Sequence, residues 1–138
     1  YFGLQIIEEI EALKKITSEI KKPVTLIIGG SKISTKINII KNLAKKFNNI
    51  IIVGGMANTM LKHMGYEVGK SISETNCESL VNEILDISKN FNCKITCPVD
   101  VVVSKNIQGN GNIMDIKKIN DDDMILDIGP KTISMIRK

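Results

Sequence analysis

Apolar residues follow two different patterns along this chain of 138 residues. Between residues 4 and 20, Leu4, Ile7 and Ile10 begin a series of apolar positions three residues apart, with Glu and Lys filling much of the rest. This spacing predicts an amphipathic helix. Residues 24–28 and 50–53 are short, nearly continuous apolar runs, which predict strands covered on both faces, as in a parallel sheet.

The alternation of helices and strands continues through the rest of the sequence. The pattern predicts further helices at about 34–47, 56–63 and 77–90, and further extended segments at 94–97, 99–104 and 124–128. It also predicts a loop at 105–112, an edge strand or ribbon at 113–119, and a solvated acidic turn at 121–123. Gly129 and Pro130 open a final helix, inside which we expect the chain to stop.

Repeated strand–helix units predict an α/β fold, a Rossmann-like three-layer αβα sandwich with a mainly parallel sheet. Ligands bind such folds beyond the carboxyl ends of the strands. Two of the predicted strands end there in a pair of glycines, Gly29-Gly30 and Gly54-Gly55. We therefore expect the functional site at these two turns.

Composition and charge narrow the classes of function. The net charge is +4, the lysines are dispersed and there is a single arginine, which argues against nucleic-acid binding. The sequence has no signal segment and no apolar stretch of membrane-spanning length, so we expect a cytoplasmic, soluble protein without a membrane partner. The three cysteines, Cys77, Cys93 and Cys97, show no disulfide framework and are interpreted as reduced, structural thiols.

Residues 29–36, with the sequence Gly-Gly-Ser-Lys-Ile-Ser-Thr-Lys, carry the strongest chemical signal. They lie between a predicted strand and a predicted helix, whose first amide groups are unpaired and carry partial positive charge. Lysines are disfavoured there by the helix dipole, so Lys32 and Lys36 are easier to explain if an anion binds. A plain turn with two solvated lysines, or glycines used only for close packing, remains open on composition alone.

Other polar residues are weaker candidates. His63 falls near a helix end, where a surface or capping role is expected. The acidic residues 121–123 lack the pattern of a calcium loop. Of two further aspartates, Asp127 is more suggestive than Asp100, because it lies inside an apolar strand; we expect it to bond to the backbone of the following helix.

Five segments in order resemble motifs of the phosphoglycerate kinase family. They are residues 27–36 (a Gly-Gly-Ser-Lys followed four residues later by Lys), 53–59 (Val-Gly-Gly-Met-Ala-Asn-Thr), 69–72, 98–102 and 126–132. The resemblance covers nearly the whole chain. It implies an enzyme of glycolysis that transfers a phosphoryl group reversibly from 1,3-bisphosphoglycerate to ADP, with Mg²⁺.

The resemblance also implies a place for this chain within the family's two-domain architecture. Residues 1–138 would be the first part of the C-terminal, nucleotide-binding domain, and residues 1–20 the helix near the hinge. The sheet would be incomplete. The N-terminal domain, which binds 3-phosphoglycerate in a monomeric full-length enzyme, would be missing. The Mg²⁺-binding loop would be missing too, so no metal ligand is expected in this chain.

Site residues follow from the same resemblance, position by position. Lys36 would contact the transferring phosphoryl group as the catalytic residue, and Lys32 the phosphates of ADP or ATP. The adenosine pocket would be lined by Gly30, Ser31, Gly54, Gly55, Ile72 and Leu126. Two departures from the family pattern, Val53 and Ile125, replace glycines and add bulk near the adenine.

The missing segments limit what we expect of the chain by itself. It begins without Met and is expected to end within a helix, which favours a partial sequence of an active enzyme. We expect no kinase turnover from these residues alone. The alternative is a non-catalytic module of the same fold that binds a nucleotide or another anion.

Overall fold

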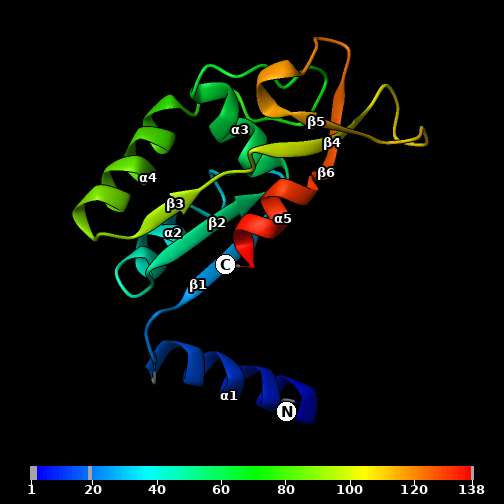
Figure 1. Ribbon diagram of the computed structural model, residues 1–138. Coiled ribbons are helices and arrows are strands. Elements are labelled where there is room, and N and C mark those ends of the chain that lie inside the picture. Colours follow the sequence, from blue (N-terminus) through cyan, green and yellow to red (C-terminus); the bar gives the residue numbers. More distant parts are fainter. Residues whose placement is uncertain (1–2, 19, 138) are drawn as a thin grey trace.

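Helices and strands alternate along the part of the chain that the structure describes, residues 3–18 and 20–137 of a computed structural model (Figure 1). The helices are α1 (Leu4–Ser18), α2 (Ile37–Ala44), α3 (Gly55–His63), α4 (Glu78–Asn90) and α5 (Pro130–Ile136). The strands are β1 (Thr25–Gly29), β2 (Asn49–Val53), β3 (Lys94–Thr96), β4 (Asp100–Ser104), β5 (Asn112–Asp115) and β6 (Met124–Ile128). The α/β prediction is confirmed. Position 19 of the first predicted helix and the last residue lie outside the described part.

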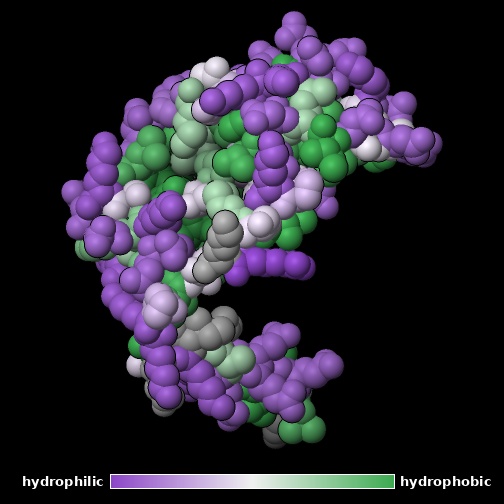
Figure 2. Space-filling view, viewed as in Figure 1, coloured by the Kyte–Doolittle hydropathy of each residue, from purple (hydrophilic) through white to green (hydrophobic). Residues whose placement is uncertain are grey.

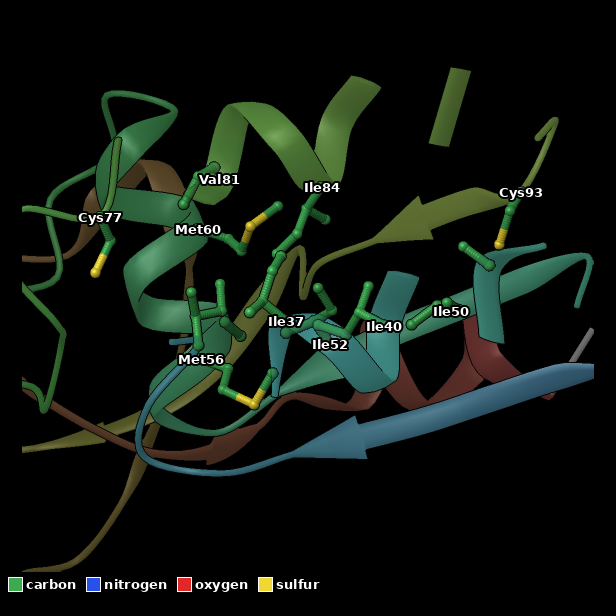
Figure 3. Packing of buried hydrophobic residues seen from close by; sticks show 13 residues of the cluster. Ile37, Ile40, Ile50, Ile52, Met56, Met60, Cys77, Val81, Ile84 and Cys93 are labelled. Carbon is green, nitrogen blue, oxygen red and sulfur yellow. The ribbon is translucent and has the colours of Figure 1, made fainter. Parts of the chain in front are cut away.

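A three-stranded parallel sheet in the order β1-β2-β3 forms the centre of the molecule. Helices α2, α3 and α4 cover one face, and their apolar positions meet those of β2 in a closely packed core (Figure 3). Ile40, Ile52, Met60 and Ile84 have no exposed surface there. The core forms because α2 and α4 each bury one apolar stripe while their polar stripes face solvent.

The opposite face of this sheet is only partly covered. Helix α5 lies over it, and its Met135 and Ile136 line a hollow together with Ile51 and other sheet residues. Strand β1, at the edge, leaves 54% of Ile27 exposed. The prediction of burial on both faces therefore holds for the middle of β2 but is wrong for β1, because no helix in the described part of the chain covers the outer face of this edge strand.

A second sheet, in the order β5-β4-β6, is antiparallel throughout. The predicted parallel sheet is confirmed by β1-β2-β3, whereas the second, antiparallel sheet was not expected from the sequence. An apolar run such as residues 101–103 specifies burial and extended backbone but not the direction of its neighbours. The predicted ribbon at 113–119 is also shorter than expected: β5 ends at Asp115 and a 3₁₀ turn, Ile116–Lys118, follows.

The sequence predicted a solvated acidic turn at residues 121–123. This prediction is wrong for Asp123. Asp123 is buried; its Oδ2 accepts hydrogen bonds from the backbone amide and the side-chain amide of Asn120, both at 2.9 Å. Its Oδ1 lies 2.8 Å from Nζ of Lys105. Hydrogen bonding to the Lys105 ammonium, more than to Asn120, lowers the pKa of Asp123 to about 2. This turn is therefore a fixed part of the fold.

Helix α1 stands apart from the rest of the described chain, and Figure 2 shows a hollow between them. Its apolar residues Leu4, Ile6, Ile7 and Ile10 are all exposed. The helix thus forms as the sequence pattern predicts but leaves these four apolar side chains exposed. No helix in the described residues is long and apolar enough to span a membrane.

Candidate functional site

The two Gly-Gly turns meet at the carboxyl ends of β1 and β2. Gly29 lies beside Val53 in the parallel register, and the backbone amide of Met56 donates to the carbonyl oxygen of Gly30 at 2.9 Å. The turns are therefore in direct contact, at the edge of the sheet where the sequence predicted the functional site.

Backbone contact between the turns requires glycine in the second of them. Gly54 has a φ of +67°, which side chains rarely adopt, and a Cβ on Gly55 would lie 2.9 Å from the carbonyl oxygen of Ser31. Close packing alone therefore explains Gly54 and Gly55. Whether the turns also bind a ligand depends on what lies beside them.

A cavity of about 560 Å³ opens beside these turns. Four of the predicted nucleotide-binding residues line it: Gly54, Gly55, Ile72 and Leu126. Gly30, Ser31, Lys32 and Lys36 do not line it but form the adjoining turn. The structure therefore separates the predicted site into an apolar cavity and a lysine-bearing turn, joined where Gly54 and Gly55 touch Gly30 and Ser31.

The cavity wall is apolar and draws on segments distant in sequence. Val53 and Ile125, the two positions that add bulk relative to the family pattern, both line it. Sequence reasoning missed Ile107, which also lines the wall and is 77% exposed, as Ile72 is 71% exposed. Ile107 lies in the 105–111 loop, where no periodic pattern marks an apolar side chain as part of a site. A ligand with a flat apolar surface would remove this exposed area from water.

The lysine-bearing turn differs from the predicted helix start. Helix α2 begins at Ile37, not near Ser34, and residues 34–36 form a turn in which the amide of Lys36 donates to the Ile33 carbonyl at 3.0 Å. Ile33 is completely buried and anchors this turn in the core. Lys36 is the residue at the helix N-cap, and among the described residues no acidic side chain pairs with it or with Lys32. Both ammonium groups remain available to an anionic ligand.

Glu74 holds this turn from the far side, although it is 40 residues away in sequence. One carboxylate oxygen accepts from the Ser34 backbone amide at 3.0 Å, and the other accepts from the Ser34 hydroxyl. The amide of Glu74 itself donates to Thr59 of α3 at 2.9 Å. The hydrogen bonds from Ser34, the hydroxyl first, lower the pKa of Glu74. No local sequence signal marks Glu74 for this role.

Replacing Glu74 with alanine is expected to loosen the turn. The Ser34 amide would lose an ionised acceptor, and its hydrogen exchange should accelerate by about tenfold. Glu78→Ala is the matched control, because Glu78 lines the same side cavity of about 460 Å³ as Glu74 but makes no bond to Ser34. Hydrogen-exchange measurements that find the Ser34 amide equally protected in both variants would contradict this role.

The remaining candidates lie away from the turns. Nε2 of His63, at the end of α3, is 3.1 Å from the Asn82 side-chain oxygen. The three cysteines are free, and burial raises the pKa of Cys97 to about 11, as expected of an unreactive thiol. No cluster of three His, Cys, Asp or Glu side chains that could hold a metal ion occurs in residues 3–18 and 20–137.

The ranking of the two aspartates is reversed by the structure. Asp127 is exposed and accepts from the amide of its neighbour Ile128, at 2.7 Å. Asp100 is 1% exposed and is the residue that bonds to the start of α5, accepting from the amides of Lys131 at 2.9 Å and Thr132 at 2.7 Å. The predicted contact to the following helix therefore exists but is made from β4, by Asp100.

Comparison with known proteins identifies a consistent set of relatives. A family model for phosphoglycerate kinase matches residues 1–138. Phosphoglycerate kinases of Rhizobium meliloti and Xanthobacter autotrophicus are 41% and 39% identical over 100% and 99% of this chain, which covers 35% of each of them. The solved phosphoglycerate kinase of Coxiella burnetii superposes with a TM-score of 0.88 at 33% identity, over 96% of this chain and 35% of that one. This chain thus spans about a third of the length of its relatives.

Proposed function

This chain belongs to the phosphoglycerate kinase family, and from that premise we propose that it supplies the nucleotide side of a phosphoglycerate kinase active site. In that enzyme a phosphoryl group passes reversibly from 1,3-bisphosphoglycerate to ADP. The observation that carries the proposal is the apolar cavity directly beside a turn with two lysines that pair with no acidic side chain in the described part of the chain. A nucleotide has the matching form, a flat base at one end and phosphates at the other.

The arrangement gives each end of the nucleotide a distinct environment. The adenosine would lie in the cavity against Ile72 and Leu126 and against the backbone of Gly54 and Gly55. The phosphates would extend past Gly30 and Ser31 toward the lysines, where Lys32 would contact the nucleotide phosphates. Lys36, at the N-cap of α2, would contact the transferring phosphoryl group. Phosphoryl transfer depends mainly on positioning the reactants and on neutralising charge. Two lysines on an anchored turn would position the phosphates and neutralise part of their charge.

The rest of the active site is proposed to lie outside this chain. We assign residues 1–138 to the C-terminal, nucleotide-binding domain, with residues 1–20 as the helix near the hinge; the separation of α1 from the other elements supports this assignment. The N-terminal domain would bind 3-phosphoglycerate. Mg²⁺ would arrive with ADP or ATP. The full-length enzyme would be a cytoplasmic monomer of glycolysis.

Titration with ADP tests the proposal. Backbone NMR signals of Gly30 and Gly55 should shift together. Lys32→Ala should weaken ADP binding by about tenfold, because it removes a charge-assisted bond to phosphate, and Lys36→Ala should weaken the binding of ATP by about as much, because ATP carries the phosphoryl group that is transferred. Lys45→Ala is the control, since Lys45 lies at the opposite end of α2, 5.7 Å from the Phe91 ring centroid. If neither the Gly30 nor the Gly55 signal shifts in millimolar ADP, the interpretation that these glycines serve close packing alone is favoured.

A further inference from the structure

Asn58, on α3, is a buried polar side chain in the otherwise apolar wall of the cavity. Among the described residues that line the cavity, only Asn58 and Asp127 have polar side chains. Asp127 is exposed to solvent, whereas Asn58 is only 5% exposed. A buried amide costs free energy unless its hydrogen bonds are satisfied, so the partners of Asn58 determine what the wall presents to a ligand.

The orientation of the Asn58 amide is fixed by chemistry. Its Nδ2 lies 3.0 Å from the backbone carbonyl oxygen of Ile72. A carbonyl oxygen can only accept a hydrogen bond, so the amide nitrogen and not the amide oxygen must face it. The side-chain oxygen, Oδ1, is therefore the group left to interact elsewhere.

Oδ1 of Asn58 faces the cavity. No donor to this oxygen occurs among the described residues, yet every fully buried side-chain nitrogen or oxygen in that part of the chain has a hydrogen-bond partner. Oδ1 must therefore be open to solvent. Asn58 is almost completely buried and lines this cavity, so its Oδ1 is exposed on the cavity side. An unpaired acceptor thus lies in an apolar wall.

We infer that Asn58 selects the base of the bound nucleotide, by accepting a hydrogen bond at Oδ1 from an exocyclic amine. The inference rests on the proposed function and extends it to the choice of substrate. Adenine carries such an amine. Hypoxanthine and guanine carry a carbonyl oxygen at the same ring position, which would place two acceptors against each other and leave both desolvated without a donor.

The ADP/IDP pair tests the inference, because the two nucleotides share ribose and phosphates and differ only in the base. By calorimetric titration we expect the chain to bind ADP about tenfold or more tightly than IDP. Purine riboside diphosphate, which has no exocyclic group, should fall between them. In Asn58→Ala the ratio of the ADP and IDP dissociation constants should drop to about one. In the matched variant Asn82→Ala, on α4 and away from the cavity, the ratio should remain that of the unchanged protein.

Each outcome has a separate meaning. Equal binding of ADP and IDP by the unchanged chain, or a ratio that persists in Asn58→Ala, overturns the role of Asn58 and leaves the proposed function standing. If no purine nucleotide binds, the proposed function falls and this inference falls with it. If Asn58→Ala does not fold, the side-chain amide NMR signals of Asn58 in the unchanged protein decide: they should shift further with ADP than with IDP, and equal shifts would overturn the inference.

Discussion

Gly69→Ala is expected to lower the free energy of unfolding by about 3 kcal/mol. Gly69 has a φ of +54°, and a Cβ there would lie 2.2 Å from the backbone oxygen of Asp123 and 2.6 Å from that of Asn120. Both obstacles are backbone atoms, which cannot move aside as a flexible side chain could. The turn they belong to is held by the buried carboxylate of Asp123. Urea denaturation followed by circular dichroism would measure the loss.

Gly65→Ala is the matched control for this prediction. Gly65 also has a positive φ, +86°, but a Cβ there would meet no atom within 4 Å. Its substitution should therefore cost only the backbone strain, about 1–2 kcal/mol. The difference between the two variants isolates the clash. If both variants lose the same free energy of unfolding, the turn at Asn120 and Asp123 moves aside at little cost, which would contradict the prediction.

Gly69→Ala should also disturb the cavity. The amide of Lys70 donates to the Asp123 carbonyl at 2.8 Å, and the Ser71 hydroxyl accepts from the amide of Ile125 at 2.8 Å. These bonds hold the loop that carries Ile72 against β6. Because the clash falls at the start of this loop, the wall of the cavity would shift.

The sequence pattern was sufficient for elements that depend on local periodicity. Helices α3 and α4 begin and end within a residue or two of their predicted bounds, since their apolar stripes specify them locally. The start of α2 was misplaced because residues 34–36 lie in a turn that is fixed by long-range contacts, of Ile33 with the core and of Ser34 with Glu74, which no local pattern encodes. The antiparallel direction of β6 was missed for a similar reason, since an apolar run carries no information about its neighbour.

The site was predictable in part for the same physical reasons. The Gly-Gly pairs at two strand ends located the meeting of the turns from the residues themselves. Ile72 and Leu126 were reached only through the resemblance to a family. Asn58 and Ile107 were not found, because their place in the wall depends on how the 66–77 segment and the 105–111 loop fold back over the sheet. The local sequence pattern does not predict where a loop packs against distant parts of the chain.

Asp100→Ala is expected to cost about 3 kcal/mol of unfolding free energy, because it leaves buried donors without an acceptor. The Asp100 carboxylate accepts from the amides of Lys131 and Thr132, and Thr132 has no exposed surface. Helix α5 is only seven residues long, too short to be stable without such an anchor. Asp127→Asn is the control and should change stability by less than about 0.5 kcal/mol, since Asp127 is exposed.

The pH dependence gives this prediction a second test. Burial alone would raise the pKa of Asp100, but the hydrogen bonds from Thr132 and Lys131 outweigh it and hold the pKa below its usual value. A carboxylate whose pKa is lowered by folding stabilises the native state above the unfolded pKa, about 3.9, and loses that contribution as the pH falls through the native value. The stability gap between the unchanged chain and Asp100→Ala should therefore be constant above about pH 5 and shrink in acid. A gap that stays the same down to pH 2 would mean that the ionised carboxylate does not hold α5 in place.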